Sequence, residues 1–131
     1  MARFCALVVF LLLCLSMFGY AAPADDLTGQ YKVDGTNPVD DSTYTGVIDI
    51  TGKGEQWALH WTFQQGEAVG IGIRQGHVLS VIFQTHDGAI GLVSFAIEEN
   101  AQGDVTLKGR WTIPGTGVVA SEVLTRVTQR V

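Results

Sequence analysis

Cysteine is scarce in this chain of 131 residues. Its 2 cysteines, Cys5 and Cys14, both lie in the apolar N-terminal segment. The rest of the chain therefore has no thiol nucleophile, no cysteine ligand for a metal and no disulfide. Its stability must come from a packed core instead.

Basic residues are also few and scattered. The chain has 8 Lys and Arg residues against 13 Asp and Glu residues, which gives a formal net charge of −5. No run of Lys or Arg forms a basic patch, which argues against nucleic acid as a partner. The acidic balance favours solubility and points to no particular partner.

The N-terminal segment has the pattern of a secretory signal peptide. Arg3 is the only charge before Asp25, and residues 4–22 are almost wholly apolar. Ala22-Pro23-Ala24 then places small residues where a signal peptidase needs them, so we expect cleavage after Ala24. Cleavage after Ala21 is the alternative.

The predicted organisation is a signal peptide over residues 1–24 and a single domain over residues 25–131. A chain of this length has one domain with one modest core. We expect the product to be secreted or periplasmic, with no membrane association after cleavage. The rival interpretation is an uncleaved membrane anchor, since a membrane span needs about 20 apolar residues.

The clearest pattern in the remainder is strand-like alternation. Trp57, Leu59, Trp61 and Phe63 are spaced two apart, which is typical of a strand with one buried face. After a break, the same spacing predicts two more sets of buried residues, listed in strand order: Val69, Ile71 and Ile73, then Leu79, Val81 and Phe83.

Alternation of this kind recurs along the domain, and no segment after residue 24 has a helical period. The predicted strands are residues 27–33, 44–50, 57–63, 68–74, 77–84, 89–98, 104–113 and 118–127. Short links force sequential antiparallel neighbours. We expect an all-β, eight-stranded antiparallel up-and-down barrel, because closure removes bare sheet edges. A β-sandwich is the alternative.

Two resemblances accompany this pattern. Leu27-Thr28-Gly29-Gln30-Tyr31 resembles the opening strand of calycin barrels, which include avidins, lipocalins and periplasmic protease inhibitors. Those proteins begin with Gly-x-Trp, and a basic residue of the last strand packs across the Trp. Here Tyr31 replaces the Trp, and the resemblance implies Arg126 as its partner. Avidin's polar biotin contacts do not map onto this sequence.

The second resemblance covers nearly the whole domain. It is to small secreted bacterial proteins of unknown function, some of which are labelled fibronectin-binding proteins, and it supplies no chemistry. The motifs that carry it are Gly29-x-Tyr31-x-Val33, Gly35-Thr36-Asn37-Pro38, Tyr44-x-Gly46-x-Ile48, Trp61, Gly70-x-Gly72, Gly76-x-x-Leu79-x-Val81 and Gly109-x-Trp111. Ala120-Ser121-Glu122 departs from it, since those proteins usually carry a Gly before a late Glu.

The candidate ligand-binding residues are aromatic. Trp57, Trp61 and Trp111 fall on the predicted inward face, and Tyr31 joins them as candidate barrel lining. The first interpretation of these rings is core packing, since aromatic rings carry much of the burial energy. The second is an aromatic pocket at one mouth of the barrel.

Metal and cofactor sites are not predicted. His60, His77 and His86 lack the spacing of metal ligands and are expected on the surface. An oxygen-rich loop offers a calcium site as an alternative to an ordinary solvated turn, which we expect. Its oxygen donors are Asp34, Asn37, Asp40 and Asp41.

No catalytic motif stands out, and an enzyme is unsupported rather than excluded. Glu122 lies among apolar neighbours near the C-terminus. An inward placement would raise its pKa and fit acid–base chemistry. We expect instead that it faces outward or pairs with Arg110.

An oligomer interface is predicted on the outside of the fifth and sixth strands. Val78, Ile82, Ile90 and Leu92 fall on their outward faces, where polar residues are usual. Strands buried on both faces read as near-continuous apolar runs. We therefore expect a homodimer or higher oligomer through this face, with scattered exposed aliphatics as the alternative.

These observations favour an exported, soluble, non-enzymatic binding protein, with a small apolar molecule or another protein as its ligand. A periplasmic inhibitor or surface-interaction module is the second hypothesis. A small enzyme that uses the barrel interior is the third.

Overall fold

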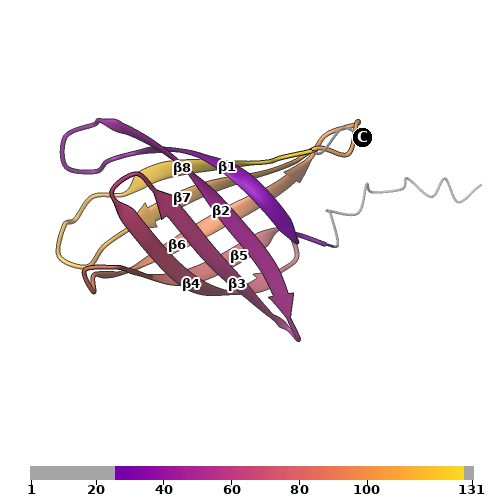
Figure 1. Cartoon of the computed structure of the whole chain (residues 1–131), viewed down its shortest axis with the longest axis horizontal. Helices are drawn as coiled ribbons and strands as arrows, with labels where there is room; N and C mark the ends of the chain where they lie inside the picture. The colour runs from indigo at the N-terminus through magenta and orange to yellow at the C-terminus, as the bar shows by residue number, and fades with distance from the viewer. Residues whose placement is uncertain (1–25, 129–131) are drawn as a thin grey trace, which may run out of the picture.

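The computed structural model of this protein describes residues 26–128. Eight strands, each hydrogen-bonded to its neighbour in the chain, close into one barrel (Figure 1). They are β1 (Gly29–Thr36), β2 (Thr43–Lys53), β3 (Gln56–Phe63), β4 (Gly66–Gln75), β5 (Val78–Thr85), β6 (Ile90–Glu99), β7 (Val105–Thr112) and β8 (Ala120–Arg126). The prediction of a closed, antiparallel up-and-down barrel is confirmed, and the sandwich alternative is wrong. The predicted signal peptide lies outside the described residues.

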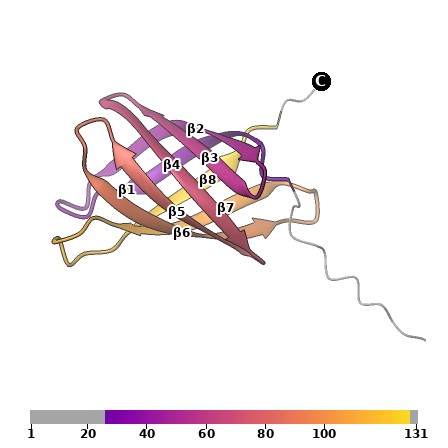
Figure 2. The same ribbon diagram turned by 90° about the horizontal axis from the view of Figure 1, so that it is seen from below.

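Closure is made by β1 and β8, whose antiparallel register runs from Tyr31 opposite Arg126 to Gly35 opposite Glu122. The strands run obliquely around the barrel, as both views show (Figures 1 and 2). Such a tilt lets eight strands enclose an interior just wide enough for side chains or one small ligand. The part of the chain that the structure describes has no helix fit to cross a membrane.

Inward-facing aromatic rings are paired with glycines on the next strand. Five such pairs lie directly opposite each other in the register: Tyr44 with Gly35, Phe63 with Gly46, Trp57 with Gly52, and Phe83 with both Gly70 and Gly91. In three of these, at Gly35, Gly46 and Gly91, an added Cβ would collide with the ring. The glycines therefore supply the space that the large rings need inside a narrow barrel.

The predicted orientation of β4 is wrong. Its inward positions are Ala68, Gly70 and Gly72, whereas Val69, Ile71 and Ile73 point outward and are more than half exposed. A Cβ at Gly70 would lie 3.0 Å from Trp61 and 2.8 Å from a backbone oxygen of β5. Because neighbouring strands fill the interior here, only the small residues of β4 can face it.

The two ends of the barrel differ. At one end Leu27 and Tyr31 are fully buried, and the Tyr31 hydroxyl donates a hydrogen bond of 2.8 Å to the Leu27 carbonyl oxygen. Arg126 lies opposite Tyr31 in the register and donates from Nη1 to the Asp26 carbonyl oxygen. Burial raises the pKa of Tyr31, and the nearby Arg126 opposes that shift. Leu27 and Tyr31 therefore plug the interior at this end.

Candidate functional site

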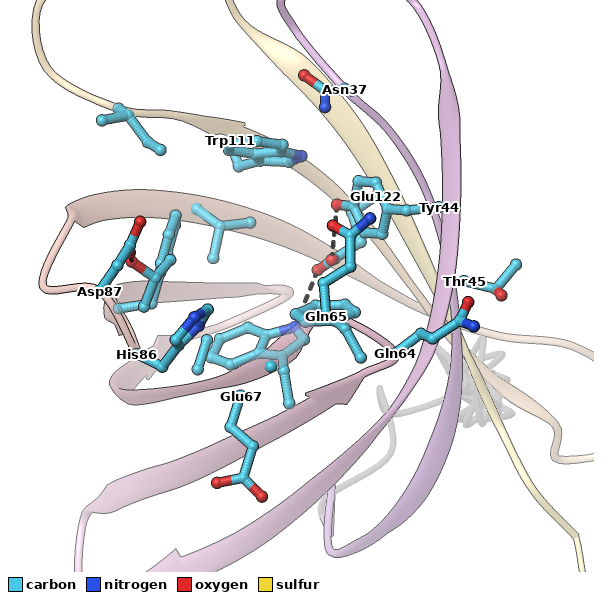
Figure 3. Close-up of a pocket in the computed structure, with 18 of the residues that line it drawn as sticks. Asn37, Tyr44, Thr45, Gln64, Gln65, Glu67, His86, Asp87, Trp111 and Glu122 are labelled. Atoms are coloured by element: carbon cyan, nitrogen blue, oxygen red, sulfur yellow. Dashed lines mark hydrogen bonds between the residues drawn. The ribbon is translucent and has the colours of Figure 1, made fainter.

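A cavity of about 480 Å³ opens at the end of the barrel where the β1–β2, β3–β4, β5–β6 and β7–β8 loops gather. A volume of this size suits a small organic ligand. The residues that line it are Asn37, Thr43, Tyr44, Thr45, Trp61, Phe63, Gln64, Gln65, Gly66, Glu67, Ala68, Phe83, Thr85, His86, Asp87, Val93, Trp111, Ile113 and Glu122. Aromatic rings form much of its depth, and amides, hydroxyls and charged groups surround its mouth (Figure 3).

Glu122 is the one buried charged residue among those described, with 5% of its surface exposed. It faces inward because β8 alternates Ala120, Glu122 and Leu124 toward the interior. Its neighbours in the register are glycines on both sides, Gly35 on β1 and Gly109 on β7. The absence of side chains at both positions leaves room for the carboxylate and for the rings that approach it.

Two side chains donate hydrogen bonds to this carboxylate. The Tyr44 hydroxyl donates to Oε1 over 2.9 Å, and the Trp61 indole nitrogen donates to Oε2 over 3.3 Å (Figure 3). Burial raises the pKa of Glu122 to about 7, and the two donated hydrogen bonds limit that shift. The carboxyl group can therefore hold or release its proton near neutral pH.

The pKa of Tyr44 is raised well above its ordinary range, first by burial and then by the neighbouring Glu122 carboxylate. The phenol therefore remains protonated at any physiological pH. It acts as a fixed hydrogen-bond donor to Glu122 and takes no part in proton exchange.

Four aromatic rings connect the two donors of Glu122 into a closed circuit. Tyr44 contacts Trp111 with ring centroids 6.3 Å apart, and Trp111 contacts Phe83 at 6.2 Å. Phe83 then contacts Trp61 at 5.9 Å, and Trp61 returns to Glu122. All these ring pairs meet edge to face, which is a favoured geometry for aromatic contacts. The circuit draws on five strands, β2, β3, β5, β7 and β8, so the whole barrel holds it in place.

The Trp111 indole nitrogen is buried but makes no hydrogen bond. It lies on the side of its ring that faces the Tyr44 hydroxyl, and this proximity works against the rise in the pKa of Tyr44 (Figure 3). Buried donors without an acceptor are rare and costly in folded proteins.

The mouth of the cavity carries Asp87 and His86, the one basic side chain among the lining residues, whereas the Glu67 carboxylate points away from the cavity and lies 3.6 Å from His60 (Figure 3). The β3–β4 and β5–β6 turns are linked by a hydrogen bond of 3.0 Å from the His86 backbone nitrogen to the Glu67 carbonyl oxygen. The Thr85 hydroxyl donates to the Asp87 carboxylate and fixes the second turn.

The structure brings together two of the four predicted ligand-binding residues. Trp61 and Trp111 line the cavity. Tyr31 is fully buried at the plugged end, and Trp57 packs on the core beside the β2–β3 turn, away from the lining. Tyr44 and Phe83 belong to the site but were not singled out from the sequence. Their glycine partners, Gly35 and Gly91, are the signal that would have marked them.

The expected outward placement of Glu122 is wrong. Arg110 is exposed on the outer face of β7, where it lies opposite Ser121 rather than Glu122. The one-residue difference matters because successive residues of a strand point to opposite faces. The inward alternative, with a raised pKa, describes the residue as it is found.

The histidines and the loop oxygens make separate, local contacts. His60 lies 3.6 Å from the Glu67 carboxylate on the outside, while His77 and His86 are exposed at turns. In the β1–β2 loop, Asn37 accepts a hydrogen bond from the Val39 backbone and Asp40 accepts from Ser42. Residues 26–128 contain no group of three His, Cys, Asp or Glu side chains arranged to hold a metal.

The four predicted interface residues lie on the outer face of β5 and β6, and all are exposed: Val78, Ile82, Ile90 and Leu92. The reversed orientation of β4 adds three more exposed aliphatic side chains, Val69, Ile71 and Ile73. Ile71, Ile82 and Leu92 are direct neighbours in the register and form a row across the three strands. We call these seven residues the aliphatic face.

The fold and the cavity define a small β-barrel protein with one plugged end and one open, aromatic end. No family model and no curated protein matches its sequence. Among solved structures, the barrel is similar to one from the de novo design of a fluorescence-activating β-barrel. The two are 14% identical over 76% of this chain and 93% of that chain, with a TM-score of 0.48. A likeness this distant assigns no function.

Proposed function

We propose that this is an exported binding protein that takes a small organic ligand into the open end of its barrel. The observation that carries the proposal is the cavity of about 480 Å³ with a buried carboxylate and an unpaired indole donor in its lining. Cores that serve stability alone seldom keep such polar groups. The N-terminal sequence pattern supports the exported location.

The chemistry of the lining supports a ligand with an apolar body and a few polar atoms. The rings of Tyr44, Trp61, Phe83 and Trp111 provide apolar contact area. The Trp111 donor and the Glu122 carboxylate provide two fixed polar contacts at the bottom. Few, well-placed polar groups within an apolar lining are typical of ligand pockets.

Tryptophan emission tests this proposal, with tert-butylbenzene as a neutral probe. Trp61 and Trp111 line the cavity, so a bound probe changes their emission, and the Trp57→Phe variant keeps the whole response. Ala68→Phe fills the cavity from β4 and is expected to abolish the response. Ala96→Phe, the same change on the outer face of β6, is the control and keeps it. Unchanged emission of the wild-type protein at probe saturation in water contradicts the proposal.

A small enzyme is the second candidate function, and the pKa of Glu122, near 7, is the observation that favours it. A carboxyl group with such a pKa beside an open cavity suits general acid–base catalysis. Binding is preferred because both oxygens of this carboxylate already accept hydrogen bonds from fixed side chains. Mass spectrometry of a bound ligand after incubation separates the two: an unchanged mass supports binding, and a converted product supports catalysis.

A further inference from the structure

We propose that the ligand is an organic cation, whose ammonium group lies among the four aromatic rings and beside the Glu122 carboxylate. This inference rests on the proposed function, because it names the ligand class of the same cavity. Three features of the cavity lead to it: the sign of its charges, the arrangement of its rings and the unbalanced charge of its buried carboxylate.

The carboxylates that face the cavity outnumber its bases. Glu122 lies at depth and Asp87 at the mouth, whereas the Glu67 carboxylate points outward to His60. Neither Lys nor Arg occurs among the described residues that line the cavity, where His86 is the one base. Low-dielectric walls lined by one sign of charge attract ligands of the opposite sign. The cavity therefore favours cations and disfavours anions.

The rings are arranged as an aromatic cage rather than a stack. The planes of Trp61 and Phe83 meet at 61°, those of Phe83 and Trp111 at 75°, and those of Tyr44 and Trp111 at 72°. In each edge-to-face pair the edge of one ring lies against one face of the other, and the opposite face of that ring stays clear of its partner. A cation is attracted to the face of an aromatic ring, most strongly to tryptophan, and cages of this kind bind quaternary ammonium groups.

The carboxylate beside the cage has hydrogen-bond donors but no opposite charge. Tyr44 and Trp61 are its partners, and the neighbouring strands present only Gly35 and Gly109 at its level. Burial of an ionised carboxylate without a counter-ion is costly. A bound cation would supply the missing charge, which a neutral ligand cannot do.

Binding of a cation should therefore expel the Glu122 proton. The pKa of the free carboxyl, about 7, falls when a positive charge arrives, so protons are released near neutral pH. The other titratable groups that face the cavity are Tyr44, His86 and Asp87. Of these, Tyr44 remains protonated. His86 is the one base, and a His86→Gln variant measures its contribution.

A pair of probes with the same shape provides the test. Phenyltrimethylammonium carries the charge, and tert-butylbenzene is its neutral equivalent. We expect the wild-type protein at pH 8 to bind the cation at least about tenfold more tightly than the neutral probe, within the range of cation–π and ion-pair contributions. Glu122→Gln should remove most of that preference, because its amide carries no charge. Asp87→Asn, a charge change at the exposed mouth, is the matched control and should have a smaller, salt-dependent effect.

Calorimetry of the wild-type protein at pH 6.5, in phosphate and in ACES, two buffers with different ionisation enthalpies, measures the released proton and needs no variant. Proton release with the cation and none with the neutral probe supports the inference. Equal affinities for the two probes, or no proton release, overturn the inference and leave the proposed function standing. If neither probe binds, both fail.

Discussion

The hydroxyl of Tyr44 on β2 lies 2.9 Å from Oε1 of Glu122 on β8, although another strand runs between them. Gly35 of β1 is the residue that separates them, and it lies opposite both in the register. The Tyr44 ring occupies the space where a side chain at position 35 would be. A glycine on one strand thus allows a tyrosine from a second to reach a carboxylate on a third.

Gly35→Ala should break this contact. Its methyl group would collide with the Tyr44 ring, and overpacking of this kind costs about 1–3 kcal/mol. Chemical denaturation measures the loss, and the Tyr44 ring signals in NMR spectra report its displacement. Gly52→Ala is the matched control, because its methyl group would lie 3.5 Å from Trp57, an ordinary contact. Equal stability of the two variants would show that Gly35 is not needed for space.

Glu122 should make the stability of the protein fall as pH rises. Its pKa is about 7 in the folded protein against an ordinary value of 4.5, so the folded state holds more protons between these values. The contribution is fully present below about pH 4.5 and is lost as pH rises through about 7, a change of about 3 kcal/mol. Asp26, Asp40 and Asp87 have lowered pKa values and act at lower pH.

Denaturation of wild type and Glu122→Gln between about pH 5 and pH 8 checks this linkage. All other titratable groups are common to both proteins, so they cancel in the comparison. We expect the free energy of unfolding of the wild type to fall relative to the variant. Parallel curves would mean that Glu122 ionises as freely as it does in the unfolded chain.

Trp61→Ala should severely destabilise the barrel. Trp61 is 3% exposed, bonds Glu122 and packs against Phe83, so its removal leaves a large cavity and an unpaired carboxylate oxygen. Truncation of a buried aromatic residue costs about 3–5 kcal/mol. Urea titration measures the loss of unfolding free energy. Trp61→Phe, which keeps a ring but removes the hydrogen-bond donor, should lose less stability than the alanine variant. A loss below about 1 kcal/mol for the alanine variant would mean that the residue is dispensable for packing.

The homodimer predicted from the sequence stays a prediction, and the structure gives it a larger surface. The aliphatic face spans β4, β5 and β6. None of the outward-facing residues within 69–73, 78–84 and 90–96 is charged. Apolar patches of this extent often mark interfaces. A second copy of the chain can cover the patch through a two-fold axis that places like surfaces together.

Light scattering tests the dimer at roughly tens of micromolar protein, where a weak dimer is populated. Ile82→Lys places a charge in the centre of the aliphatic face and should produce a folded monomer. Val47→Lys, on the exposed side of β2, is the matched control and should leave the dimer intact. A wild-type monomer at this concentration would refute the interface.

The architecture could be predicted from the sequence because in most strands large apolar residues recur at every second, inward-facing position. The orientation of β4 was predicted wrongly. Either Ala68, Gly70 and Gly72 or Val69, Ile71 and Ile73 could face the interior, and hydrophobicity favoured the second set. The first set faces inward because Trp61 and the β5 side chains leave room only for small residues. That lack of room cannot be seen in the sequence of β4 itself.

The site was harder to predict for a related reason. Trp61 and Trp111 were visible as inward aromatic residues, but which end of the barrel each occupies depends on the register of several strands. The inward orientation of Glu122 could not be predicted either, since a carboxylate among apolar neighbours usually faces solvent. It is tolerated inside because Tyr44 and Trp61, distant in sequence, supply its hydrogen bonds.

The most direct test of the cavity as a binding site is the NMR response of the three indole N–H groups to phenyltrimethylammonium. Trp61 and Trp111 line the cavity, whereas Trp57 packs on the core away from it and serves as an internal control. We predict that the signals of Trp61 and Trp111 shift with the probe, Trp111 most because its N–H has no partner, and that the Trp57 signal stays in place. Three unmoved signals at saturating probe, or a shift of Trp57 alone, would contradict a ligand site at the open end of this barrel.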